Sequence, residues 1–160
     1  MTLSGIGYDV HRFAEGRPLI LGGVEIAHSH GLDGHSDADV LTHAIADAVL
    51  GAIGERDIGF HFPNSDESIR GISSLEILRK AAALVRAQGG RVLNIDATLI
   101  AEAPKISPHV AAMRAQLAAA LGLPVARVGV KATTNERMGF LGRGEGIAAM
   151  AVASVEVPDA

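Results

Sequence analysis

The residues best suited to chemistry are an aspartate and a histidine two positions apart, Asp9 and His11, and a second histidine, His43. In an extended strand residues i and i+2 point to the same side, so Asp9 and His11 project together while Val10 faces the opposite way into a core. The imidazole of His43 would complete a set of three nitrogen and oxygen ligands. Three protein ligands with one open position are typical of a catalytic zinc site rather than a structural one.

His43 lies in a stretch, residues 37–53, whose pattern predicts a helix. Side chains four apart share a helical face, so Asp39, His43 and Asp47 form one polar row beside an apolar stripe. Each pattern alone has a simpler interpretation. Asp-x-His is common as a surface hydrogen bond, and the helical row could be a solvated face with charge support.

A second group of polar residues follows a strand expected over residues 125–134. Lys131, two threonines and Glu136 offer a cation, hydroxyls and backbone donors to phosphate oxygens, and Glu136 could complete a Mg²⁺ site. Further on, Arg143 stands between glycines, where the backbone can approach an anion closely. An ordinary turn and an ordinary flexible loop remain alternatives, and the glycine segment lacks the Gly-Lys-Ser/Thr ending of a P-loop.

Composition limits the possible partners and compartments. The chain has 160 residues, which predicts one domain over residues 1–160, and a net charge of −4, which makes nucleic acid or an anionic membrane an unlikely main partner. It has no cysteine, so a transition metal must be held by histidine and carboxylate. With no signal peptide and no apolar run of membrane length, we expect a cytoplasmic protein.

The remaining elements are predicted in alternation. Strands are expected at residues 6–13, 92–102, 125–134 and 147–157, with a hairpin turned by Gly22 and Gly23. Ser73 and Glu76 form a capping-box pattern at the start of one helix, and Ser107 with Pro108 starts another. The polar segment 61–68 is expected to be a mobile loop. The prediction is an α/β (α+β two-layer) fold: a mixed β-sheet covered by helices on one face, with the other face buried in a homo-oligomer.

Six separated motifs in this order and spacing resemble the 2-C-methyl-D-erythritol 2,4-cyclodiphosphate synthase family over nearly the whole chain. They are Asp9-Val-His11, His35-Ser-Asp37, Asp57-Ile-Gly59, Ala103-Pro-Lys105, Lys131-Ala-Thr-Thr134 and Phe140-Leu-Gly-Arg-Gly-Glu-Gly146.

The resemblance implies an enzyme of the non-mevalonate route to isoprenoids. The family converts 4-diphosphocytidyl-2-C-methyl-D-erythritol 2-phosphate into the cyclic diphosphate and CMP, as a homotrimer with active sites between neighbouring subunits. Its cofactors would be Zn²⁺, held by Asp9, His11 and His43, and Mg²⁺ or Mn²⁺, held with the help of Glu136.

The resemblance also implies roles for residues around the metals. His35 and Thr134 would align the reacting phosphates and stabilise the transition state. Phe140 and Arg143 would line a channel on the three-fold axis. The substrate would contact Ser36, Asp57, Ile58, Gly59, Phe62, Pro63, Asn64, Ser65, Asp66, Ala101, Ala103, Pro104, Lys105, Ile106, Ser107, Thr133, Asn135, Phe140 and Arg143.

The chain departs from the family's usual pattern at Asn64, where an aspartate is common, and at Asn135 and Ser107. Any role of position 64 that requires charge is therefore lost. Two other functions are compatible with the same residues: a zinc-dependent phosphohydrolase, and a trimeric protein that binds an isoprenoid diphosphate. The resemblance gives no catalytic role to the other histidines, His28, His30, His61 and His109.

Overall fold

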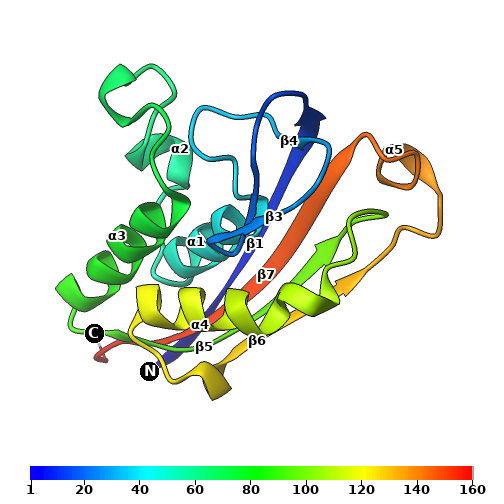
Figure 1. Ribbon diagram of the computed structural model, residues 1–160. Helices are drawn as coiled ribbons and strands as arrows, with labels where there is room; N and C mark the ends of the chain where they lie inside the picture. Colours follow the sequence, from blue (N-terminus) through cyan, green and yellow to red (C-terminus); the bar gives the residue numbers. More distant parts are fainter. Residues whose placement is uncertain (160) are drawn as a thin grey trace.

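The computed structural model describes residues 1–159 and has two layers, a five-stranded sheet and a set of helices on one of its faces (Figure 1). The sheet is mixed. β1 runs antiparallel to β4 and β7, β7 runs antiparallel to β5, and β5 runs parallel to β6. From one edge to the other the strands are β4 (Gly31–Leu32), β1 (Thr2–Ala14), β7 (Gly146–Glu156), β5 (Arg91–Ile100) and β6 (Val128–Thr133).

Three longer helices form the second layer. They are α1 (Val40–Ala52), α3 (Ser74–Ala87) and α4 (Val110–Leu121). The shorter elements are the hairpin strands β2 (Leu19–Leu21) and β3 (Val24–Ile26), the helices α2 (Ile58–His61) and α5 (Gly139–Gly142), and the 3₁₀ turns η1 (Glu67–Ile69), η2 (Ser107–His109) and η3 (Val125–Arg127). Within residues 1–159 none of the helices has the length and apolar character to cross a membrane.

Helix α1 lies unusually close to β1 because the facing strand positions are glycines. A Cβ added at Gly5 would come within 2.0 Å of the Ala48 carbonyl oxygen, and one added at Gly7 within 1.9 Å of the Ala44 carbonyl oxygen. Both helix residues are fully buried alanines. This contact between small residues sets the distance between His43 on α1 and the side chains of β1.

The opposite face of the sheet carries exposed apolar side chains on its two central strands. Ile6 and Tyr8 of β1 are 68% and 52% exposed, and their register partners Val152 and Met150 of β7 are each 46% exposed. Val10 belongs to this face at 39% exposure. The expectation that Val10 enters the chain's own core is therefore wrong: it points away from Asp9 and His11, but onto the uncovered face.

Two predicted helix starts differ from the structure. The first helix begins at Val40 rather than near position 37, because the Asp39 side chain caps it by accepting from the Thr42 N–H. Asp39 is fully buried, so it is not part of a solvated row with His43 and Asp47. At the other helix, Ser73 is the N-cap residue but makes no side-chain capping bond, and Glu76 pairs with Arg79 instead. The predicted capping box does not form.

Two further segments contain short helical turns that the sequence did not predict. Residues 125–127 form the turn η3 before the strand β6 begins at Val128. Segment 61–68 contains the end of α2 and the start of η1, and its side chains are partly or fully exposed. The hairpin at Gly22 and Gly23 is confirmed, with both residues at positive φ (58° and 73°) as a tight strand reversal requires.

Candidate active site

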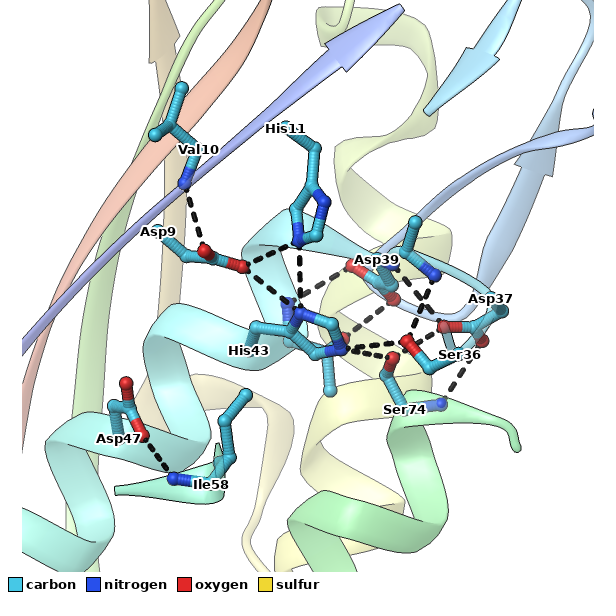
Figure 2. Close-up of polar contacts among 12 residues, drawn as sticks. Asp9, Val10, His11, Ser36, Asp37, Asp39, His43, Asp47, Ile58 and Ser74 are labelled. Atoms are coloured by element: carbon cyan, nitrogen blue, oxygen red, sulfur yellow. Dashed lines mark hydrogen bonds and ion pairs between the residues drawn. The ribbon is translucent and has the colours of Figure 1, made fainter. Parts of the chain in front are cut away.

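The structure brings Asp9, His11 and His43 together, with their polar atoms facing a common point (Figure 2). Asp9 Oδ2 lies 2.9 Å from His11 Nε2 and 3.0 Å from His43 Nδ1, and the two ring nitrogens are 3.3 Å apart. Ligands bonded to zinc at about 2.0–2.1 Å in a tetrahedron are separated by about 3.3 Å. The donor types and their spacing fit a tetrahedral zinc site with one position left for another ligand.

The outer nitrogen of the His11 ring indicates why the cluster suits a cation. His11 Nδ1 contacts the backbone carbonyl of Asp33, which can only accept, so that nitrogen carries a proton and Nε2 of the neutral ring presents a lone pair to Asp9. Burial lowers the pKa of His11, but the hydrogen bond and charge of Asp9 outweigh it and leave the pKa raised. Without a metal, a proton on His11 can supply the positive charge that the Asp9 carboxylate attracts.

Asp9 shows the complementary shift. Burial raises its pKa, but hydrogen bonds and charge interactions with His11 and His43 outweigh that effect and hold the pKa well below the usual range. Asp9 is therefore ionised at any pH near neutral. A carboxylate that stays ionised, beside two imidazoles, is suited to bind a divalent metal, and binding would displace the proton of His11.

A pocket of about 210 Å³ opens beside this cluster. Its lining brings several predicted substrate contacts next to the predicted metal ligands. They are His35, Ser36, Ile58, Gly59, Phe62 and Asn64. The predicted residues Asp57, Pro63, Ser65 and Asp66 are outside the lining. Asp57 caps α2, Asp66 caps η1, and the Asp66 carbonyl oxygen lies 3.1 Å from His35 Nε2.

Asp47 links the metal helix to this pocket, one helical turn after His43. Its Oδ1 accepts the backbone N–H of Ile58 at 2.9 Å, so α1 holds the first residue of α2 in place (Figure 2). Burial raises the pKa of Asp47, and the negative charges of Asp57 and Asp9 act in the same direction. Asp47 therefore positions backbone of this pocket and is not a member of the Asp9, His11 and His43 cluster.

The predicted cytidine and phosphate residues surround a different pocket, of about 340 Å³, at the ends of β5 and β6. Its predicted lining residues are Ala101, Pro104, Lys105, Ile106, Ser107, Thr133 and Thr134, while Ala103, Asn135 and Glu136 lie beside it in the chain without lining it. Most of these side chains are exposed or half-buried.

Glu102 supports the turn that carries Thr134 and Glu136. Its Oε1 accepts the backbone N–H groups of Asn135 and Arg137, each at 3.0 Å. Glu136 and Arg137 both have positive φ, 52° and 58°, which costs about 1 kcal/mol or more for a residue with a side chain. The two bonds to one carboxylate oppose that strain. Sequence reasoning did not single out Glu102, because only the fold brings it under this turn.

The two pockets are separate within one chain. Among the described residues they share no lining residue. Asp9 on β1, Ala149 on β7, Leu99 on β5 and Ala132 on β6 lie in one register row, so the metal strand and the phosphate strand are three strand spacings apart. That is about 14 Å between backbones. After their predicted ligands, we call the Asp9, His11 and His43 cluster with its pocket the metal half-site, and the pocket at the ends of β5 and β6 the nucleotide half-site.

Phe140 and Arg143 occupy a third location. Phe140, 45% exposed, lines a hollow of about 590 Å³ together with Val10, Arg12 and Glu145. Arg143 follows the helix α5, and its Nη2 pairs with Glu145 Oε2 at 2.9 Å. The hollow opens beside the exposed apolar face of the sheet, and His11 also lines it, so it borders the metal half-site.

The fold and the cluster define a class of protein: an α+β protein whose Asp9, His11 and His43 are suited to bind a divalent metal beside a pocket of about 210 Å³. Comparison with known proteins identifies the family. Residues 2–156 match the model of the YgbB family. The chain therefore belongs to the YgbB family.

Individual relatives agree with this assignment. The chain is 61% identical over 160 residues to a protein named 2-C-methyl-D-erythritol 2,4-cyclodiphosphate synthase from Akkermansia muciniphila, with 99% of this chain and 95% of the relative covered. A protein of the same name from Alkalilimnicola ehrlichii is 61% identical over 153 residues, with 95% and 93% covered.

Solved structures have the same fold. The bifunctional IspDF from Campylobacter jejuni superposes with a TM-score of 0.94 at 42% identity, covering 99% of this chain but only 43% of that longer chain. IspF from Plasmodium falciparum, solved as a CDP complex, superposes with a TM-score of 0.85 at 31% identity, covering 99% of this chain and 97% of that one.

Proposed function

We propose that this chain is an enzyme of the non-mevalonate isoprenoid pathway that converts 4-diphosphocytidyl-2-C-methyl-D-erythritol 2-phosphate into 2-C-methyl-D-erythritol 2,4-cyclodiphosphate and CMP. The observation that carries the proposal is the convergence of Asp9, His11 and His43 at a pocket lined by predicted substrate contacts, in a chain that is 61% identical to synthases of that name. The reaction joins two phosphates of one molecule. It needs the substrate held in a folded conformation more than it needs a covalent group from the protein.

The metal half-site is proposed to hold Zn²⁺ at Asp9, His11 and His43, and the turn after β6 to hold Mg²⁺ or Mn²⁺ at Glu136. When bound, these ions would withdraw negative charge from the phosphate oxygens. The protein's own contribution is to keep the three ligands on two rigid elements, β1 and α1, which are packed together through Gly5 and Gly7.

The other residues are proposed to position the two ends of the substrate. Ser36, Asp57 and Gly59 would bind the methylerythritol part, and the segment 101–107 would hold the cytidine with Lys105 near the diphosphate. His35 and Thr134, one from each half-site, would align the attacking phosphate oxygen with the phosphorus from which CMP leaves. Phosphoryl transfer of this kind depends on such alignment and on charge neutralisation.

We propose further that the working form is a homotrimer in which the metal half-site of one copy meets the nucleotide half-site of the next. Two observations support an oligomer: the apolar face formed by Ile6, Tyr8, Val10, Met150 and Val152, and the spacing of about 14 Å between the half-site strands in one chain. Burying that face between copies would remove it from water.

The function is tested by a phosphorus NMR time course with the purified protein, the proposed substrate, Zn²⁺ and Mg²⁺. We expect CMP and a cyclic diphosphate to accumulate at equal rates. CMP with a linear product would instead identify a phosphohydrolase. Tight binding of an isoprenoid diphosphate without any turnover would identify a binding protein.

The assembly is tested by sedimentation of a Tyr8→Glu variant. A charge at the centre of the apolar face should dissociate the trimer, because each copy would bury an unpaired carboxylate. Val125→Glu is the matched control, since Val125 is similarly exposed, at 44%, but lies in η3 rather than on this face. A Tyr8→Glu variant that sediments as the wild type does would contradict the proposed interface.

A further inference from the structure

Behind His43, away from the metal half-site, lies a continuous chain of polar contacts that joins α1, α3 and the loop before α1 (Figure 2). His43 Nε2 is 2.8 Å from Ser74 Oγ, and Ser74 Oγ is hydrogen-bonded to Asp37 Oδ1. The Ser74 backbone N–H also donates to Asp37, to Oδ2 at 3.0 Å. Ser74 is fully buried and is the first residue of α3, so the side chain of Asp37 caps that helix from a distant part of the chain.

The direction of these hydrogen bonds follows from the chemistry of the end group. An ionised carboxylate can only accept, so the Ser74 hydroxyl must donate its one proton to Asp37. Ser74 Oγ then has only lone pairs for His43, so the Nε2 of His43 must be the donor. A second hydroxyl, Ser36 Oγ, lies 3.1 Å from the same nitrogen and itself accepts the Ala38 N–H.

We propose that Ser74 and Asp37 are positioning residues that fix His43 in the tautomer with its proton on Nε2, and so hold the Nδ1 lone pair toward Asp9 and His11. The proposal rests on the proposed role of His43 as a metal ligand. An imidazole whose far N–H is bound to an acceptor network is a better metal ligand than a free imidazole, and removing such a partner weakens metal binding by about 10- to 100-fold.

The anchoring of Asp37 has a visible cost in the backbone. Ala38 is fully buried and has φ of 58°, in the left-handed region that a residue with a Cβ rarely adopts. On one side Asp37 is fixed to Ser74, and on the other Asp39 accepts from the Gly22 and Gly23 N–H groups at 2.9 Å and 2.7 Å. The strained turn between two anchored aspartates is what a rigid support for His43 requires.

The test compares Ser74→Ala with Thr42→Val. Thr42 is also fully buried and also donates its hydroxyl to an aspartate, Asp39 at 2.7 Å, but its side chain makes no hydrogen bond to the His43 ring. Zinc affinity is measured by competition with a chromophoric chelator, and the His43 tautomer by nitrogen-15 NMR of the zinc-free protein. We expect Ser74→Ala to weaken zinc binding about 10- to 100-fold and to populate both tautomers, and Thr42→Val to change neither.

Ser74→Ala with zinc affinity and tautomer both equal to wild type would overturn the proposal. If Ser74→Ala does not fold, Ser74→Thr and Asp37→Asn replace it: retention of the hydroxyl in the first should keep the Nε2–H tautomer, and loss of the purely accepting partner in the second should mix the tautomers. A mixture of tautomers in Ser74→Thr, or a single tautomer in Asp37→Asn, would contradict the proposed positioning of His43 by Ser74 and Asp37.

Failure of the metal site itself would be recognised separately. His43→Ala should abolish tight zinc binding if His43 is a ligand. If His43→Ala binds zinc as the wild type does, the ligand assignment is wrong, whatever the tautomer of His43. If His43→Ala loses zinc while Ser74→Ala keeps full affinity, His43 is a ligand and only the proposed positioning role of Ser74 and Asp37 is wrong.

Discussion

The metal half-site and the nucleotide half-site are built in opposite ways. Asp9, His11 and His43 sit on a long strand and a buried helix, and contacts with Asp33, Ser36 and Ser74 fix both rings. The nucleotide half-site consists of a loop and a turn at the open ends of β5 and β6, with exposed side chains and one prominent brace, Glu102.

The contrast follows from what each half must do. Metal ligands must stay within a few tenths of an ångström of one geometry, which regular elements and outer hydrogen bonds can provide. A nucleotide pocket must admit and release a large ligand, and loops on a rigid edge permit that. All three predicted metal ligands come from one chain, whereas the predicted nucleotide half-site is an open pocket.

The largest expected effect is on the metal half alone. His43→Ala removes one of three ligands, so zinc affinity and turnover should each fall by at least about 100-fold, more than the loss of an outer partner causes. CDP binding, measured by calorimetry without zinc, should stay within about twofold, because the nucleotide pocket shares no described residue with the cluster. His30→Ala, at a partly exposed histidine outside the cluster, is the control and should change neither quantity.

A second prediction disturbs the metal half-site through the packing of α1 on β1 and leaves its three ligands in place. Gly7→Ala places a Cβ 1.9 Å from the Ala44 carbonyl oxygen, so α1 must move away from β1. We expect a loss of about 3 kcal/mol in the free energy of unfolding, measured with urea, and about tenfold weaker zinc binding. Gly51→Ala, on the same helix, meets only the Ile6 carbonyl oxygen at 3.8 Å and should be neutral or stabilising. Equal stability of the two variants would contradict the packing argument.

The nucleotide half is tested at its brace. Glu102→Ala leaves the Asn135 and Arg137 N–H groups without their acceptor, and should weaken CDP binding and kcat/KM by about tenfold while leaving zinc affinity unchanged. Glu102→Gln keeps an oxygen that can accept both N–H groups, so it should retain most of the wild-type affinity. If Glu102→Ala binds CDP normally, the turn holds its shape without the brace.

The sequence predicted these two halves to different depths, for physical reasons. The i,i+2 spacing of Asp9 and His11 and the helical placement of His43 are local properties, so the cluster could be anticipated. Ser74 and Glu102 act on residues 31 and 33 or 35 positions away, and no local pattern reveals such contacts. The same reason applies to the failed capping box: the start of this helix is capped instead by Asp37, distant in sequence, which accepts the Ser74 N–H.

For the uncovered face of the sheet, the strand pattern in the sequence predicted which side chains share the face but not what covers it. Alternation along β1 correctly separated Val10 from Asp9 and His11, but alternation alone does not say whether a face is covered by the same chain or by another copy. Only the placement of α1, α3 and α4 on one side of the sheet shows that Val10, Tyr8 and Ile6 are left open (Figure 1). The prediction of helices on one face only was confirmed by that arrangement.

The smallest expected effect lies at Asp47, which joins the metal helix to α2. Burial raises its pKa above the ordinary value of 3.8, so the folded chain holds this proton more tightly than the unfolded chain does. Its contribution to stability is therefore greatest below pH 3.8 and is lost as the pH rises through the raised pKa. Asp47→Asn keeps an oxygen for the Ile58 N–H and has no proton to lose.

The free energy of unfolding of Asp47→Asn, relative to wild type, should therefore grow as the pH rises from about 4 to about 7, measured with urea in the presence of a chelator so that no metal-linked protons contribute. Glu25→Gln, at an exposed position of β3, is the control and should give a flat difference. If the difference in free energy of unfolding between Asp47→Asn and wild type does not change with pH either, the Asp47 carboxylate has the same pKa in the folded and unfolded chain. The link between the metal helix and the substrate pocket would then rest on the hydrogen bond to Ile58 alone, without a penalty for the buried charge.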